Sequence, residues 1–347
     1  MRALRFSPDG RWLVALTQSG RSIRVYERSG REYHDRGSLA GLGLRRSSIL
    51  EVEFHPGGAL VLTGEGHRLE VWDLAGRRML REFGSLIPAE PGRIAAYEGL
   101  GVSLDGRYVE TSFLARDQGE RYSWETGGLA ATRWGNSGPF VFHPEGELLA
   151  VSAVDSEYYT QVQFCSWTGG AYVWYPPVLI AYMAVGGAAF SPDGRAFAMV
   201  GGVDTHWCQV HSFPECTILS RHELGTVEEL RFPYEVTEAL CFVGSLLLLG
   251  RVDGSVVGID VSDGAVRFEH AAHPTRVLSI RLHPSEPWIA TGSDDGEIVL
   301  WEMEEATPRG CDLPDGSVTR RFVEAFPPLP AGQWRDPDNE LLFEPEI

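Results

Sequence analysis

The sequence predicts an all-β fold, and three observations lead to this prediction. Glycine and proline supply 40 and 21 of the 347 residues, so turns are frequent and the elements between them are short. Between the turns lie short runs in which apolar and polar residues alternate, which is the period of a β-strand. One turn sequence also recurs along the chain, mostly every 40 to 48 residues. A chain with one repeated unit of this length is predicted to form repeated small sheets.

The recurring turn is clearest at residues 6–10, which read FSPDG. Proline presets the φ angle of such a turn, and glycine accepts the positive φ that closes it. The gap before the last copy is twice as long as the others, and a copy without proline fits near residue 241. The seven copies are therefore anchored at Phe6, Phe54, Val102, Phe142, Phe190, Cys241 and Leu282.

Each unit contains four predicted strands. In the second unit they are residues 50–54, 60–63, 69–72 and 78–83. A four-stranded sheet cannot bury both of its faces alone, so the units must stack on one another around an axis. The sequence therefore predicts a seven-bladed β-propeller of four-stranded antiparallel blades over residues 1–326.

Residues 71–74 (VWDL) and 300–303 (LWEM) resemble the WD-repeat family, and the last unit resembles it most fully. Other units lack the Trp or the His of that pattern, and the repeated turn is also similar to those of lactonase-like and TolB-like propellers. The resemblance implies that the last unit holds the structural hydrogen-bond tetrad of the family, formed by His273, Thr291, Asp295 and Trp301.

The two ends of the propeller are predicted to meet. The chain enters directly into an innermost strand, so we expect residues 307–313 or 318–326 to complete the last blade. Residues 327–347 contain five prolines and form a predicted acidic, extended tail. Residues 1–50 have a net charge of +6 and residues 301–347 a net charge of −7. This contrast favours a contact between the ends, or else a docking patch formed by Arg36, Arg45 and Arg46.

Composition excludes several classes of function. The net charge of −18 opposes nucleic-acid binding, because such binding depends on cationic contacts. All 30 basic residues are arginine, so lysine-dependent chemistry is excluded. No apolar run reaches the roughly 20 residues that span a bilayer, and five irregularly spaced cysteines favour a reducing compartment. We expect a lysine-free cytoplasmic protein without nucleic-acid or membrane partners, and the Ala, Gly, Arg and Pro content suggests a bacterial source.

No catalytic or metal site is predicted. The histidines of the repeated turn, at positions 55, 143 and 283, recur with the repeat and are assigned structural roles. One cluster has metal-ligand residue types, but alternation along a strand separates its members onto opposite faces. We therefore predict no enzyme, no metal and no cofactor, and keep a lactonase-like or hydrolase propeller with a site in the central channel as the alternative. The cluster comprises His206, Cys208, His211 and Cys216.

Aromatic residues indicate a binding face near blades four and five. Tyr and Trp are enriched at the centres of protein interfaces, and here they gather in and beside loops that open on one face of a propeller. We predict a non-catalytic scaffold, or a regulatory subunit of a larger complex, that binds a protein or peptide on this face. The predicted contacts are Tyr158, Tyr159, Trp174, Tyr175, Tyr182, His206 and Trp207.

Overall fold

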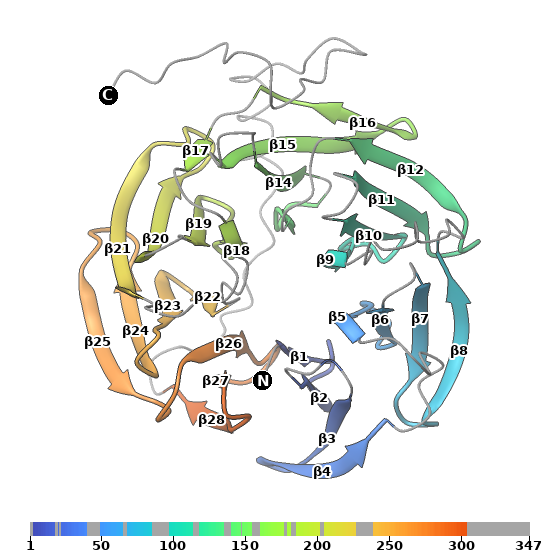
Figure 1. The fold of residues 1–347 in the computed structure, drawn as a ribbon, viewed down its shortest axis with the longest axis horizontal. Helices are drawn as coiled ribbons and strands as arrows, with labels where there is room; N and C mark the ends of the chain where they lie inside the picture. The colour runs from blue at the N-terminus through green and yellow to red at the C-terminus, as the bar shows by residue number, and fades with distance from the viewer. Residues whose placement is uncertain are drawn as a thin grey trace.

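The molecule is a ring of antiparallel sheets (Figure 1). The computed structural model describes residues 3–17, 20, 22–39, 49–64, 68–84, 97–113, 118–134, 140–146, 148–154, 160–176, 179–181, 185–201, 205–226 and 239–303. These residues form 28 strands, and the first strand of each sheet lies nearest the axis of the ring. Among them, no helix is long and apolar enough to cross a membrane.

The first three blades are simple four-stranded meanders, in which each strand pairs with the next one along the chain. Blade one contains β1 (Ala3–Phe6), β2 (Trp12–Leu16), β3 (Ile23–Ser29) and β4 (Glu32–Ser38). Blade two contains β5 (Ile49–Phe54), β6 (Leu60–Gly64), β7 (Arg68–Asp73) and β8 (Arg78–Phe83). Blade three contains β9 (Tyr97–Val102), β10 (Tyr108–Phe113), β11 (Gln118–Ser123) and β12 (Leu129–Trp134).

Blade four differs because two short strands share its outer position. Both β16 and β17 pair with β15, and the chain between them contains Pro176 and Pro177. Proline has no backbone N–H, so it cannot donate to the ladder and the outer strand is interrupted there. The strands are β13 (Phe140–Phe142), β14 (Leu148–Val154), β15 (Thr160–Thr168), β16 (Ala171–Trp174) and β17 (Leu179–Ala181).

Blades five and six have the regular four strands, whereas the last sheet has three in the described part of the chain. Blade five contains β18 (Val185–Phe190), β19 (Ala196–Gly201), β20 (Thr205–Ser212) and β21 (Ile218–Thr226). Blade six contains β22 (Leu240–Val243), β23 (Leu246–Gly250), β24 (Ser255–Asp260) and β25 (Val266–Ala271). The last sheet contains β26 (Val277–Leu282), β27 (Trp288–Ser293) and β28 (Ile298–Glu302).

The prediction of seven four-stranded blades is therefore wrong in its count. The described residues form six complete blades and one three-stranded sheet that occupies the position of a seventh. The segments expected to complete it, residues 307–313 and 318–326, and the predicted tail at 327–347 all lie outside the described residues.

The apolar cores lie between neighbouring blades. One cluster joins the first two blades through Val14, Leu16 and Leu62, and another joins blades five and six through Val210 and Leu249. All five side chains are buried. Each blade thus covers the apolar face of its neighbour, and this burial provides the main favourable term for closing a ring of small sheets.

Three histidines of the repeated turn each contact the next blade in the ring through a glycine carbonyl. The Nε2 atoms of His55 and His143 lie 2.9 and 3.0 Å from the carbonyl oxygens of Gly106 and Gly194 in the following blade. Those two glycines have φ angles of 70° and 68°. A Cβ added to them would lie 2.7 and 2.4 Å from the histidine ring, so both the backbone conformation and the close approach require glycine. His283 makes the third such contact.

Candidate interaction surface

The structure describes part of the predicted binding face. Tyr158, Tyr159, Tyr182, Arg45 and Arg46 lie outside the described residues. The remaining predicted contacts are described. Trp174 is on β16 of blade four, and Tyr175 directly follows it. His206 and Trp207 are on β20 of blade five, and Arg36 is on β4 of blade one.

Tyr175 is not an exposed contact, and its prediction as one is wrong. Its side chain is 4% exposed and packs in the core shared by blades four and five. Its backbone N–H donates to the Phe164 carbonyl at 2.9 Å, and its hydroxyl lies 3.1 Å from that of Ser166. The backbone bond extends the pairing of β16 with β15, which places the ring between two blades instead of in solvent.

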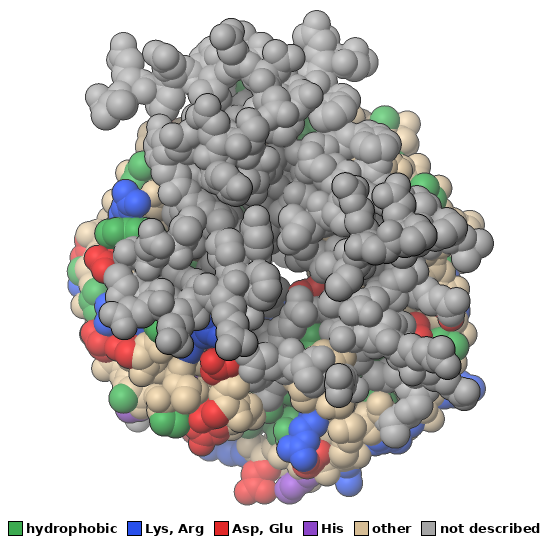
Figure 2. Space-filling view, viewed as in Figure 1, with side chains coloured by type: hydrophobic (Ala, Val, Ile, Leu, Met, Phe, Trp, Pro, Cys, Tyr) green, Lys and Arg blue, Asp and Glu red, His purple; other side chains and the backbone are tan. Residues whose placement is uncertain are grey.

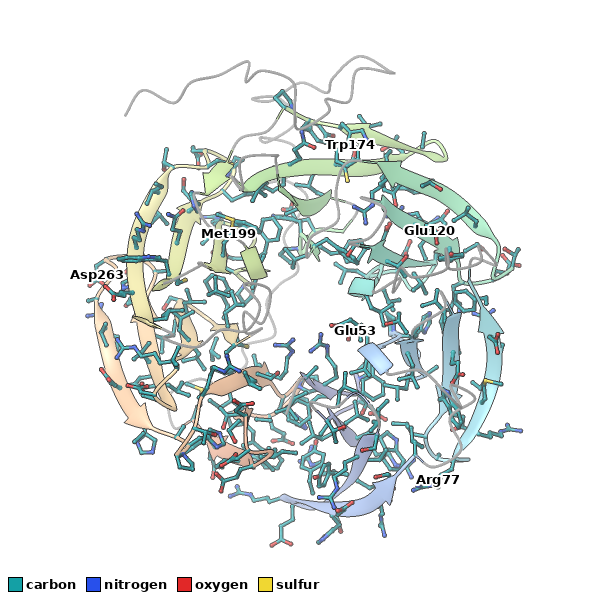
Figure 3. All side chains as sticks on the ribbon, in the orientation of Figure 1. Glu53, Arg77, Glu120, Trp174, Met199 and Asp263 are labelled. Carbon is teal, nitrogen blue, oxygen red and sulfur yellow. The ribbon has the colours of Figure 1, made fainter. Side chains whose placement is uncertain are left out.

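Trp174 is half-buried at the outer edge of blade four (Figure 3). It packs against the buried Cys165 and lies 6.2 Å from the Tyr172 ring, measured between ring centroids. Part of the Trp174 side chain therefore packs inside the protein, and the remainder is accessible to a partner.

A buried ionic cluster between blades three and four was missed by the sequence analysis. Glu110 of β10 accepts hydrogen bonds from Arg121 of β11 and from Tyr172 of β16, whose hydroxyl lies 2.8 and 2.7 Å from the two carboxylate oxygens. The Nε atom of Arg133 of β12 lies 3.5 Å from the same carboxylate. The side chains of Glu110, Arg121 and Arg133 are fully buried. The cluster therefore links four strands through ion pairs and hydrogen bonds that are shielded from water.

Aromatic rings complete this ionic cluster. The Arg121 guanidinium lies 4.4 Å from the centroid of the Trp167 ring and 4.9 Å from that of Tyr108. Burial, and then the carboxylate of Glu110, raise the pKa of the Tyr172 phenol well above its ordinary value, so it stays protonated and donates. The sequence carried one signal for this cluster, because Glu110 and Arg121 are opposite each other on adjacent strands.

Trp207 of β20 lies at the interface between blades four and five. It is half-buried against the core of these two blades, and the exposed Arg221 guanidinium stacks 4.3 Å from the centroid of its ring. His206 precedes it on β20, where its backbone is opposite Gly225. Of the predicted contacts on blade five, Trp207 thus keeps an accessible side chain.

The strand β21 that carries Arg221 also exposes large apolar side chains. Ile218 and Leu219 of β21 are 63% and 48% exposed, and Ile218 has the highest value among the exposed large apolar residues that are described. We call Trp207, Ile218, Leu219 and Arg221 the β21 patch. Figure 2 shows that apolar side chains on the rim are interspersed with charged ones of both signs. Trp and Arg are also the residue types most enriched at interface hot spots.

Arg36 is on the outer strand of blade one, where an acidic residue of the same blade neutralises it. Its Nε donates to Glu27 at 3.0 Å, and Arg11 donates to the other oxygen of that carboxylate at 2.7 Å. Other arginines of this blade contact the last sheet, with Arg28 2.7 Å from Glu286 and Arg31 3.6 Å from Glu302. Part of the basic charge near the N-terminus is therefore paired within the molecule.

The predicted tetrad is present with a different acid. The Thr291 hydroxyl lies 2.8 Å from His273 Nε2 and accepts a hydrogen bond from Trp301 Nε1 at 2.8 Å. His273 Nδ1, however, lies 3.1 Å from the Glu297 carboxylate. Asp295 accepts from the Ser293 hydroxyl and from the Glu297 backbone N–H at 3.2 Å, so it stabilises the tight turn in place of orienting the histidine.

The predicted cluster of metal-ligand types is divided between two environments. Cys208 packs in the core between blades five and six, whereas Cys216 packs in the core between blades four and five. Within the described ranges, no group of three or more His, Cys, Asp or Glu side chains could hold a metal ion.

Near the axis of the ring, Arg5 donates to Glu53 at 2.8 Å, so these two charges pair with each other across the first two blades (Figure 3).

Comparison with known proteins agrees with this geometry. Residues 264–302 match the family model described as WD domain, G-beta repeat. This segment is similar to a WD40 repeat. It includes the outer strand β25 of blade six and all three strands of the last sheet, so the repeat in sequence is offset by one strand from the blade in space. Its His, Thr and Trp are the three residues that form the hydrogen bonds described above.

Three curated proteins share parts of the chain. Shk1 kinase-binding protein 15 of Schizosaccharomyces pombe is 34% identical over 23% of this chain. WD repeat and HMG-box DNA-binding protein 1 of Homo sapiens is 26% identical over 36%, and the WD repeat-containing protein 55 homolog of Aedes aegypti is 30% identical over 38%. The chain covers 23%, 11% and 27% of their lengths, respectively. All three organisms are eukaryotes, so the comparisons give no support to a bacterial source.

Proposed function

We propose that this chain is a protein-interaction scaffold and that a protein or peptide partner contacts the β21 patch of blade five. The observation behind this proposal is that Ile218 and Leu219 are both exposed on the same strand as Arg221, which stacks on Trp207. Exposed apolar side chains with an aromatic and a guanidinium beside them form the kind of surface that is buried when proteins associate.

The fold supports a scaffold for a second reason. The outer strands expose apolar residues on several blades, including Met79 and Leu80 of β8 and Val266 and Phe268 of β25. A ring of separate blades can therefore offer several surfaces at once. The name of the fission yeast relative, which describes kinase binding, agrees with a protein-binding role. The name of the human relative describes DNA binding, a property that the net charge of −18 does not favour here.

The proposal is tested with a photo-crosslinking amino acid at position 219 in cells of the source organism. A partner captured at this position should be lost in an Arg221→Glu variant, because the change reverses the charge and removes the stacking on Trp207. Arg195→Glu is the matched control, since Arg195 is an exposed arginine in the first turn of the same blade. Capture that persists in Arg221→Glu, or that is lost equally in the control, would refute the assignment to this patch.

A further inference from the structure

Within the described residues, one junction in the ring has no chain connection across it. Consecutive blades are joined by the polypeptide, whereas β1 of blade one and β26 of the last sheet come from opposite ends of the described chain and lie side by side (Figure 1). The backbone N–H of Leu4 donates to the Ser279 hydroxyl at 3.2 Å across this junction. Side-chain contacts must therefore supply the closure that the chain supplies elsewhere.

His283 is at the centre of these contacts. Its Nε2 lies 3.1 Å from the Tyr33 hydroxyl and 3.4 Å from the Gly10 carbonyl oxygen, and Tyr33 itself donates to that carbonyl. A Cβ at Gly10, whose φ is 67°, would lie 2.4 Å from the histidine ring. The ring of His283 is thus seated directly on the first turn of blade one.

The hydrogen bonds of His283 require a neutral ring. Its Nδ1 faces the backbone N–H groups of Ser285 and Glu286 at 3.2 and 3.0 Å, so this nitrogen must accept. The proton is therefore assigned to Nε2, which donates to the Tyr33 hydroxyl. A second proton on Nδ1 would point at two other N–H groups and break this arrangement.

The surroundings of His283 also oppose a positive charge. The rings of Phe6 and Trp288 lie 5.0 and 5.3 Å from it, measured between centroids. The charged groups that face it are Arg28 of β3 and Glu286 of its own turn, which pair with each other at 2.7 Å. Burial lowers the pKa of His283 below its ordinary value, and Arg28 lowers it further, against the opposite effects of the Gly10 carbonyl and Glu286.

We propose that the junction between the last sheet and blade one is a pH-sensitive closure, held shut while His283 is neutral and released when it gains a proton. The released ring separates at this junction, which the described part of the chain does not cross, so β1 and β26 lose each other as neighbours. His55 and His143 make the same contact at junctions that the chain also spans. Protonation of His143 weakens packing there without parting the blades.

The experiment follows backbone hydrogen exchange in peptides that cover β1 and β26, at pH 7.5 and pH 5.5, after correction for intrinsic exchange. In the natural chain, exchange at this junction should rise at the lower pH, by up to about tenfold in total, because pH 5.5 is one unit below the ordinary histidine pKa of 6.5 that the opened junction restores. A His283→Asn variant should exchange faster at pH 7.5 and show no such rise. His143→Asn is the control and should keep the natural response at β1 and β26.

An NMR titration of the His283 ring gives an independent measurement that needs no variant fold. A pKa below 6.5 that coincides with the midpoint of the exchange change supports the closure. A midpoint at or above 6.5 overturns the proposal, as does a pH response at β1 and β26 that survives in His283→Asn.

Discussion

The free energy of unfolding should depend on pH through His211, a buried histidine of β20. Its side chain is 2% exposed and faces the Cys216 backbone, but within the described residues neither ring nitrogen makes a well-formed hydrogen bond. Burial lowers the pKa of His211 from 6.5 to about 4 in the folded protein. An unfolded chain restores the ordinary value, so folding and protonation are linked at this residue.

The sign and size of the effect follow from these two pKa values. Between pH 6.5 and about 4 the unfolded chain binds a proton that the folded chain does not, so stability falls as pH falls through this window. The contribution is fully present above pH 6.5. A difference of about 2.5 units at about 1.4 kcal/mol per unit gives a loss of about 3 kcal/mol by pH 4.

A His211→Leu variant tests this directly. Urea unfolding at pH 7, 6, 5 and 4.5 should show a shallower decline in stability for the variant than for the natural protein. At pH 7 the variant should be no less stable, because it no longer buries two nitrogens that lack well-formed hydrogen bonds. His34→Leu, which removes an exposed histidine of β4, is the matched control for the loss of one histidine. Equal slopes for His211→Leu and the natural protein would show that the linkage is wrong.

Two further predictions concern the ionic cluster of blade three. Tyr172→Phe should lower the free energy of unfolding by about 1–3 kcal/mol, because the buried Glu110 carboxylate loses a donor, and urea unfolding measures this. Tyr175→Phe, whose hydroxyl meets a neutral serine, should cost less, and an equal loss would contradict the special role of the carboxylate. Gly119→Ala should lower the melting temperature, since the new methyl would lie 2.3 Å from the buried guanidinium of Arg133. An unchanged melting temperature would show that Arg133 can move.

The repeated turn explains why so much of the fold was predictable. Strand, turn and strand are local features, and Phe6, Phe54 and Phe190 each end the first strand of a blade immediately before the turn. The interruption of the outer strand in blade four was less evident, although Pro176 and Pro177 are visible in the sequence. Its position depends on how far β15 extends, which pairing decides and local sequence does not.

The candidate surface was harder to predict because an aromatic residue serves packing and binding equally well. Tyr175 and Trp207 are both aromatic residues of the same two blades, yet one is in the core and the other is capped by an exposed arginine. The sequence does not single out Ile218, Leu219 and Arg221, because strands that contain both polar and apolar residues are common. Their meaning appears when their exposure is known.

The sequence by itself determined the repeat, the strand order within each unit and the glycines of the turns, because these depend on residues close together in the chain. The tertiary structure decided which residues meet across blades. It brought His283 onto Gly10, placed Glu110 beside Tyr172, and set Glu297 in place of Asp295 at His273. These pairings depend on the twist and spacing of separate sheets around an axis, and no local pattern in the chain encodes that geometry.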